Sequence, residues 1–274
     1  MHAAPSTATE RDWGLFGPDS VAWRLHADPV MLIGGMRAVL VQALEPRAMA
    51  GVAQHSSFRE DPWGRLARTS AFVLETTYGT VAEAESACAR VRAVHRRVRG
   101  VDPVTGRAYA ADDPELLRWV HAVEVDSFLA AYRAFAGRVS DADADRYVAE
   151  MAVVAQRCEL PAELAPKTFA ELQEYLGTVT GLVVSDSTRD ALRMVLAPPL
   201  PAVLKLLWPV PVSATLAILP PTARRLYGLP ALGPAMLPVR LNTFVMSRLW
   251  NTLVTRPPIV VAARQRAATK DAAA

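Results

Sequence analysis

The spacing of apolar residues between positions 81 and 98 constrains the fold of this chain more than any other feature. At steps of three and four residues the chain carries Val81, Ala84, Cys88, Val91, His95 and Val98. This alternation places the side chains on one face of an α-helix, and mostly charged residues fill the other faces. Ala and Leu dominate the apolar content of a chain that is 51% hydrophobic and 7% aromatic, a composition that favours helices over strands. The sequence therefore predicts an all-α protein.

Cap residues, prolines and apolar periodicity predict the other helices. They cover residues 21–28, 29–46, 64–78, 114–135, 140–158, 168–178, 187–196, 203–219 and 239–253, beside the clearest one at 81–99. The helix at 29–46 is apolar on nearly every side, which is typical of the middle of a bundle, and Gly34 and Gly35 permit close approach of another backbone or a flat ligand. A length of 274 residues suits one large domain, so we expect a single-domain multi-helix bundle.

The charge and cysteine content argue against several classes of protein. Thirty Lys and Arg against 27 Asp and Glu give a net charge of +3, and the arginines are dispersed among acidic residues, so nucleic acid is not expected as a partner. Cys88 and Cys158 cannot form a metal knuckle and are expected to be reduced, buried thiols. The N-terminal residues lack the pattern of a secretory signal, which predicts a cytoplasmic protein.

The most apolar segment, residues 194–219, does not resemble a transmembrane helix. Five prolines and Lys205 interrupt it, whereas a span requires about 20 consecutive apolar residues. We expect a pair of short, proline-broken helices that pack on the core. The alternative is weak peripheral contact with a membrane through residues 198–220.

A few polar residues are expected to point inward, because helical spacing places them beside apolar ones. His95 is either a core histidine or, walled by valines, an axial ligand of a haem iron. His121 and Glu124 either form a buried hydrogen bond or belong to a two-metal site, for which the chain has too few ligands. Arg65 and Thr69 lie one turn apart, and guanidinium groups at such a position either face solvent or pair with haem propionates or a ligand carboxylate.

Glycine-rich phosphate loops, nucleophile elbows, zinc-protease helices and kinase motifs are absent, but five segments carry a resemblance. These are GLFGPDSVAWRLHADPVMLIGGMRAVLVQAL, HSSFREDPWGRLARTSAFV, VRAVHRRVRG, WVHAVEVDSFLAAYRAF and RRLYGLP. In this order they resemble the MpaB-like oxygenases, a family that includes the haem-dependent latex-clearing proteins. The resemblance implies a catalytic domain at residues 14–258, a flexible N-terminus at 1–13, and a tail at 259–274 that is disordered at its end.

The resemblance also implies roles for individual residues. His95 matches the histidine that binds haem b iron from the proximal side, and Arg65 and Thr69 match distal residues. Arg68 stands where a lysine can sit over the iron in the latex-clearing proteins. The carboxylate base of those proteins has three candidates here, namely Glu45, Glu60 and Glu75. The family often has His-Pro where this chain has Glu45-Pro46.

We therefore expect a haem b-dependent oxygenase that uses dioxygen on a small or lipid-like apolar substrate. Its buried haem pocket would lie between the helices at 65–78, 81–99 and 114–135. His95 would bind iron, Arg65 would also contact the cofactor, and Arg65, Arg68 and Thr69 would orient dioxygen or substrate. His121 and Glu124 would act as donor, base or structural support. The alternatives are a haem-free protein that binds an apolar ligand or a membrane surface, and a haem sensor or carrier without turnover.

Overall fold

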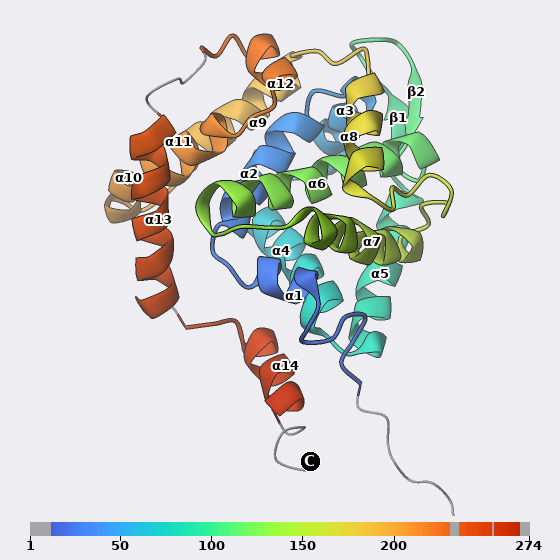
Figure 1. Cartoon of the computed structure of the whole chain (residues 1–274). Helices are drawn as coiled ribbons and strands as arrows, with labels where there is room; N and C mark the ends of the chain where they lie inside the picture. Colours follow the sequence, from blue (N-terminus) through green and yellow to red (C-terminus); the bar gives the residue numbers. More distant parts are fainter. Residues whose placement is uncertain (1–11, 231–235, 254, 269–274) are drawn as a thin grey trace, which may run out of the picture.

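The computed structural model describes residues 12–230, 236–253 and 255–268, which form an all-α single domain with one small hairpin (Figure 1). The first helices are α1 (Val21–His26), α2 (Met31–Gln42), α3 (Pro46–His55), α4 (Pro62–Tyr78) and α5 (Val81–His95). After the strands β1 (Arg99–Val101) and β2 (Ala108–Ala110) come α6 (Pro114–Phe135), α7 (Asp141–Arg157), α8 (Phe169–Thr178) and α9 (Asp186–Leu196). The last are α10 (Ala202–Leu207), α11 (Pro209–Ala217), α12 (Pro221–Leu226), α13 (Met236–Leu253) and α14 (Pro258–Ala268). The expected all-α, single-domain class is confirmed, whereas the described residues do not show the expected haem pocket.

Two helices, α2 and α6, pack along each other in the centre of the molecule (Figure 1). Gly34 makes this possible, because a Cβ there would lie 2.7 Å from Phe128 Cδ1 and 3.2 Å from the Ser127 carbonyl oxygen. Gly35 faces open space, with no atom of the described residues near its Cβ position. Gly34 therefore serves the approach of a neighbouring backbone, as one of the two sequence-based interpretations predicted, whereas Gly35 has no such role.

A buried ion pair crosses the contact between α2 and α6. Arg37 Nη2 lies 2.7 Å from Asp126 Oδ2, and the two side chains are 5% and 14% exposed. The same guanidinium donates through Nη1 to Ser127 Oγ and through Nε to the carbonyl of Ile218. Asp126 also accepts a hydrogen bond from the side chain of Gln173. One arginine thus joins α2, α6 and the end of α11, and sequence analysis did not identify it.

The main core lies where α1, α5, α6 and α7 meet, with the C-terminal half of α4 beside them. Residues 259–268, expected as the start of a tail, form most of α14, which packs against α4 and buries Val260 and Ala263 in this core. The sequence of this helix has little amphipathic pattern, so its formation depends on packing against the rest of the domain. Residues 1–11 and 269–274, expected to be flexible or disordered, lie outside the described residues.

Several predicted bounds differ from the structure, and the helix predicted at 29–46 already ends at Gln42. The helix predicted at 81–99 ends at His95, because Arg99–Val101 pairs with Ala108–Ala110 as an antiparallel hairpin in what was expected to be a linker. The segment 203–219 breaks at Trp208 and Pro209 into α10 and α11, which confirms the expected pair of short, proline-broken helices. The expected packing on the core is correct for α11 but wrong for α10, none of whose residues is buried. The helices α3 and α12 were not predicted. None of the described helices is both long and apolar enough to span a membrane.

Candidate functional site

The first part of the candidate site is α4, which begins after Asp61. The Asp61 carboxylate accepts the backbone N–H of Gly64 and Pro62 occupies the first turn, which is a common start for a helix. Arg65 follows one turn later and is half-buried. Burial lowers the pKa of its guanidinium, and the neighbouring Arg68 lowers this pKa further. No described residue forms an ion pair or hydrogen bond with the Arg65 side chain, so its donors are available to an anionic group.

Two other residues predicted on this helix face solvent. Arg68 is an exposed side chain that pairs with Asp61, Nη1 to Oδ2 at 3.4 Å. The Thr69 hydroxyl donates to the carbonyl of Arg65 at 3.1 Å, a bond within the helix that leaves its lone pairs open. The structure thus places both Arg68 and Thr69 at the surface, whereas helical spacing predicted that Thr69 points inward.

The second part of the site is α5 with His95 at its last position. Thr80 and Glu83 form a capping box at its start, and Ala84, Ala87 and Cys88 form its buried side. His95 is half-buried, and its Nδ1 is enclosed without a hydrogen-bond partner. Burial lowers the pKa of this imidazole, although Asp112 and Glu159 act in the opposite direction. The ring is therefore neutral at pH 7, the form that binds a metal ion.

The apolar wall predicted around His95 is incomplete. Val81 and Val94 are 45% and 56% exposed, whereas Val91 and Val98 are half-buried. The predicted stripe is therefore correct for its centre but wrong at its first residue. The buried residues of α5 are Ala84, Ala87 and Cys88, so the helix is covered by its neighbours α4 and α7 mainly in its first half.

The third part of the site is one face of α6, on which His121 and Glu124 lie between two apolar residues. Leu117 packs against Ala152, Ala155 and Leu160, and the Phe128 ring lies 5.3 Å from the ring of His26. Burial lowers the pKa of His121 to about 4 and raises the pKa of Glu124 to about 7. His121 Nε2 is enclosed without a partner, and no described hydrogen bond joins His121 to Glu124. The predicted buried His–Glu hydrogen bond is therefore absent from the described contacts.

The C-terminal end of α7 brings α5 and α6 together. Arg92 of α5 donates to the carbonyl of Arg157 and lies 3.8 Å from the Glu159 carboxylate. Glu159, just after α7, raises the pKa of His95, so His95 lies near this end of α7. Glu124 raises the pKa of Cys158, which caps the same end. The helix α7 therefore contacts both α5, which carries His95, and α6, which carries His121 and Glu124, and α4 with Arg65 packs against the same α5.

Two cysteines 70 positions apart in the sequence meet in this region. Cys88 and Cys158 are both free thiols, and both belong to the core between α5 and α7. A hydrogen bond from Cys158 lowers the pKa of Cys88, while that bond and burial raise the pKa of Cys158. Both thiols are free, as expected, but only Cys88 is buried and Cys158 is half-buried. Their proximity has no signal in the sequence.

A buried histidine that sequence analysis missed lies beside the site. His26 Nδ1 is 2.8 Å from Thr77 Oγ1, and His26 Nε2 is 2.8 Å from the Tyr147 hydroxyl. Burial lowers the pKa of His26 to about 4. Because both of its ring nitrogens have protein partners, this imidazole serves packing. His95 and His121 differ from it by each holding an enclosed nitrogen without one.

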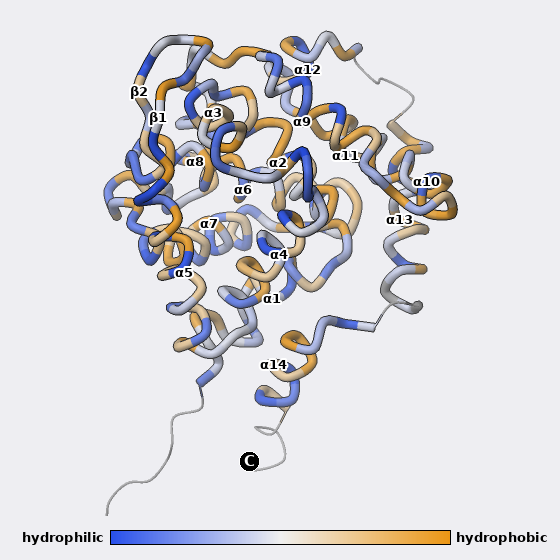
Figure 2. Tube along the Cα trace, turned by 180° about the vertical axis from the view of Figure 1, so that it is seen from behind, coloured by the Kyte–Doolittle hydropathy of each residue, from blue (hydrophilic) through white to orange (hydrophobic). Residues whose placement is uncertain are grey.

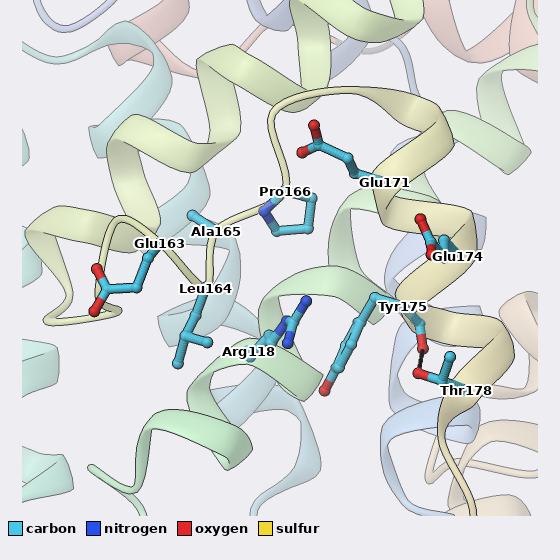
Figure 3. A pocket seen from close by; sticks show the side chains of 9 residues that line it. All are labelled: Arg118, Glu163, Leu164, Ala165, Pro166, Glu171, Glu174, Tyr175 and Thr178. Carbon is cyan, nitrogen blue, oxygen red and sulfur yellow. Dashed lines mark hydrogen bonds between the residues drawn. The ribbon is translucent and has the colours of Figure 1, made fainter.

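Two open clefts lie elsewhere, on either side of Tyr175. The first, of about 370 Å³, is lined by α6, α8 and the segment before α8, and Figure 3 shows Arg118 beside Tyr175 at its base. The Arg118 guanidinium stacks 3.9 Å from the ring centroid of Tyr175. The second, of about 300 Å³, contains Glu45 and Pro46. None of the predicted site residues on α4, α5 or α6 lines either cleft, so Glu45 is separate from the imidazoles.

The donor set fits a haem better than a bare metal ion. In the described part of the chain no group of three or more His, Cys, Asp or Glu residues could hold a metal ion. A haem needs only one protein ligand for its iron, because the porphyrin supplies four nitrogens. A neutral imidazole with an enclosed, unpartnered nitrogen suits that role, and the unpaired guanidinium of Arg65 suits a propionate. His95, His121 and Arg65 therefore fit the group that the sequence predicts.

The comparisons with known proteins agree with the resemblance. A family model described as "ER-bound oxygenase mpaB/B'/Rubber oxygenase, catalytic domain" matches residues 23–250. The chain belongs to this family. The match covers the helices from α1 to α13, so it includes all residues of the candidate site and identifies an oxygenase catalytic domain. Comparison with curated proteins and with solved structures gives no match.

Glu124 gives the haem-free protein a pH-dependent stability. Its pKa is about 7 in the folded protein against an ordinary 4.5, so the folded state keeps a proton that the unfolded state has lost between these values. The stabilisation is complete below pH 4.5 and is lost as the pH rises to 7. Glu124→Gln removes this loss. We expect the stability of the variant relative to the parent to rise by roughly 1–3 kcal/mol between pH 4.5 and 7.5, measured by urea unfolding.

The control for this experiment is Glu115→Gln, an exposed glutamate at the start of the same helix. The difference in unfolding free energy between Glu115→Gln and the parent should not change with pH. The two buried histidines, His26 and His121, have lowered pKa values and act in the opposite direction over pH 4–6.5, but they are common to all three proteins. Equal pH profiles for Glu124→Gln and the parent would show that Glu124 is ionised at pH 5.

Proposed function

We propose that the protein is a haem b-dependent oxygenase that uses dioxygen to oxidise a small or lipid-like apolar substrate. The observation that carries the proposal is the pair of enclosed imidazole nitrogens, on His95 and His121, in a chain of an oxygenase family. An enclosed nitrogen without a partner costs folding free energy of about 1–3 kcal/mol, which a ligand would offset. Haem b, when bound, supplies the iron at which dioxygen is reduced.

Three residues would hold the cofactor and its surroundings. His95 is assigned as the iron ligand, because its imidazole is neutral and the resemblance places the proximal histidine there. Arg65 would pair with a carboxylate, since no described residue uses its guanidinium. Thr69 keeps acceptor lone pairs on the same helix, one turn after Arg65. Arg68 is paired with Asp61 at the surface, and its positive charge lowers the pKa of Arg65.

His121 and Glu124 would handle protons. A carboxyl group with a pKa of about 7 is partly protonated at neutral pH and can both donate and accept a proton. His121, with a pKa of about 4, stays neutral and offers a hydrogen bond without a charge. Apolar neighbours such as Phe128 and Leu117 on the same face exclude water, which favours an apolar substrate.

The test is an absorption spectrum of the purified protein after reconstitution with haem b, followed by dioxygen uptake with unsaturated fatty acids and isoprenoid alcohols. We expect a Soret band at one haem per chain and substrate-dependent uptake. A band without uptake on any substrate would favour a haem sensor or carrier. Absence of a band after reconstitution would overturn the proposal and favour the haem-free ligand-binding alternative.

A further inference from the structure

The helix α13 carries its apolar side chains on its outer face. Its buried positions include two hydroxyl residues, Thr243 and Ser247, and Thr243 has no hydrogen-bond partner among the described residues. The outer positions hold Leu237, which is 75% exposed, together with Leu241, Phe244, Val245, Leu249 and Trp250. A helix on a protein surface normally has the reverse arrangement. The pattern therefore indicates that this face is covered by something apolar.

The short helix α10 has the same property. None of its residues is buried, and Val203 and Leu206 are 77% and 79% exposed. In Figure 2 it forms a strongly apolar projection at the edge of the molecule, near α13. Both helices pack against α11, so their exposed side chains belong to one side of the domain. We name these exposed apolar side chains of α10 and α13 the outer apolar face.

The outer apolar face adjoins the start of α4. The indole of Trp63 donates to the carbonyl of Pro199, just before α10, and its ring packs edge-on against Trp208 at 6.0 Å. Arg65 follows Trp63 by two residues on the same helix. An apolar molecule held at this face would therefore lie close to the helix that carries part of the candidate site.

The helices α10 and α13, which carry the face, contain basic residues but no acidic ones, although Asp28 of another segment accepts a hydrogen bond from Ser247 of α13. Residues 191–270 contain ten Lys and Arg but no Asp or Glu, although the whole chain has a net charge of only +3. Lys205, Arg240 and Arg248 are exposed on α10 and α13 themselves, and Arg248 lies over the ring of Phe244 at 4.9 Å. Cations that flank exposed apolar residues suit the interface of an anionic bilayer, where apolar side chains enter and cations contact head groups. A second copy of the same face would instead bring like charges together.

We propose that the outer apolar face docks peripherally onto the surface of an anionic lipid bilayer. The sequence-based alternative of weak membrane contact through residues 198–220 covers only part of this surface. The helix α11 in that segment packs on the core, with Ala214 and Thr215 buried, and Leu219 just after it is buried too. Contact with lipid would therefore be made by α10 and α13. The proposal does not require haem or turnover. It would place an apolar substrate in the bilayer close to α4.

The experiment is co-sedimentation of the full chain with vesicles of phosphatidylcholine alone and of phosphatidylcholine with 30 mol% phosphatidylglycerol, a composition of roughly physiological charge. We expect binding to the anionic vesicles that falls as salt is raised. The variant Leu206→Asp/Leu237→Asp should lose at least about tenfold in partition coefficient, and Lys205→Glu/Arg240→Glu should lose about as much. All four side chains are exposed, so circular dichroism should be unchanged.

The matched controls lie on the β1–β2 hairpin, where Val104 and Arg107 are also exposed. Val104→Asp and Arg107→Glu should bind vesicles as the parent does. Absence of vesicle binding, or binding that the outer-face variants do not reduce, would overturn the proposal. A concentration-dependent dimer or capture of an acidic protein that these variants abolish, without vesicle binding, would assign the face to a protein partner and would also overturn it.

Discussion

The variant His95→Ala is expected to lose haem b. If His95 supplies the iron ligand, its removal leaves the cofactor held only by peripheral contacts such as that of Arg65. Loss of outer-shell partners typically costs 10–100-fold in metal affinity, and loss of the ligand itself should cost at least the upper end of this range. The Soret band of the reconstituted variant should therefore be absent or strongly reduced at equimolar haem. The measurement is a haem titration followed by absorption spectroscopy.

The control for this variant is His55→Ala. His55 is an exposed histidine at the end of α3 that hydrogen-bonds the carbonyl of Arg99, and it belongs to no part of the candidate site. Its variant should retain the parent spectrum. Added free imidazole should partly restore the band of His95→Ala, which loss of folding would prevent. Full haem occupancy with an unchanged spectrum in His95→Ala would exclude His95 as the ligand and direct attention to His121 Nε2.

The second large effect is expected from Asp126→Ala, which removes one partner of the buried pair between α2 and α6. The Arg37 guanidinium would then remain in the centre of the protein with only the neutral acceptors Ser127 and Ile218. Breaking a buried pair in this way costs about 3–5 kcal/mol, because the remaining charge is not compensated. Urea unfolding monitored by circular dichroism should show this loss of unfolding free energy.

The comparison for Asp126→Ala is Asp190→Ala. Asp190 pairs with Arg59 at 3.0 Å, but these two side chains are 33% and 38% exposed. Water can replace that pair, so we expect a loss of about 1 kcal/mol or less. Equal losses in the two variants would show that Arg37 finds another partner or solvent, and would remove the ion pair from its role in joining α2 to α6.

Much of the fold was predictable from local sequence. The helices α6 and α7 begin where Asp113 and Ser140 indicate, because an N-cap residue acts within one turn of the helix. The helix α4 begins at Pro62, two residues before its predicted start at residue 64. The close approach at Gly34 was also predicted, since a missing Cβ in an apolar helix indicates a neighbouring backbone. The family followed from ordered motifs, which the family model matches over residues 23–250.

The candidate site was only partly predictable. His95 and His121 were identified as inward-pointing residues, and both hold an enclosed nitrogen without a partner. Thr69 was expected to point inward but is exposed, because helical periodicity gives the angle of a side chain but not which side of the helix meets a neighbour. The end of α5 at His95 was missed because the hairpin that follows it depends on pairing with residues 108–110.

The sequence by itself determined the helical class, most helix starts, the family and the residue types available for chemistry. Only the tertiary structure decided which distant residues meet, namely Cys88 with Cys158, Arg37 with Asp126 and His26 with Tyr147. It also decided that α13 turns its apolar side outward. The reason is that helix formation depends on neighbours three or four positions away, whereas these contacts depend on how whole helices pack.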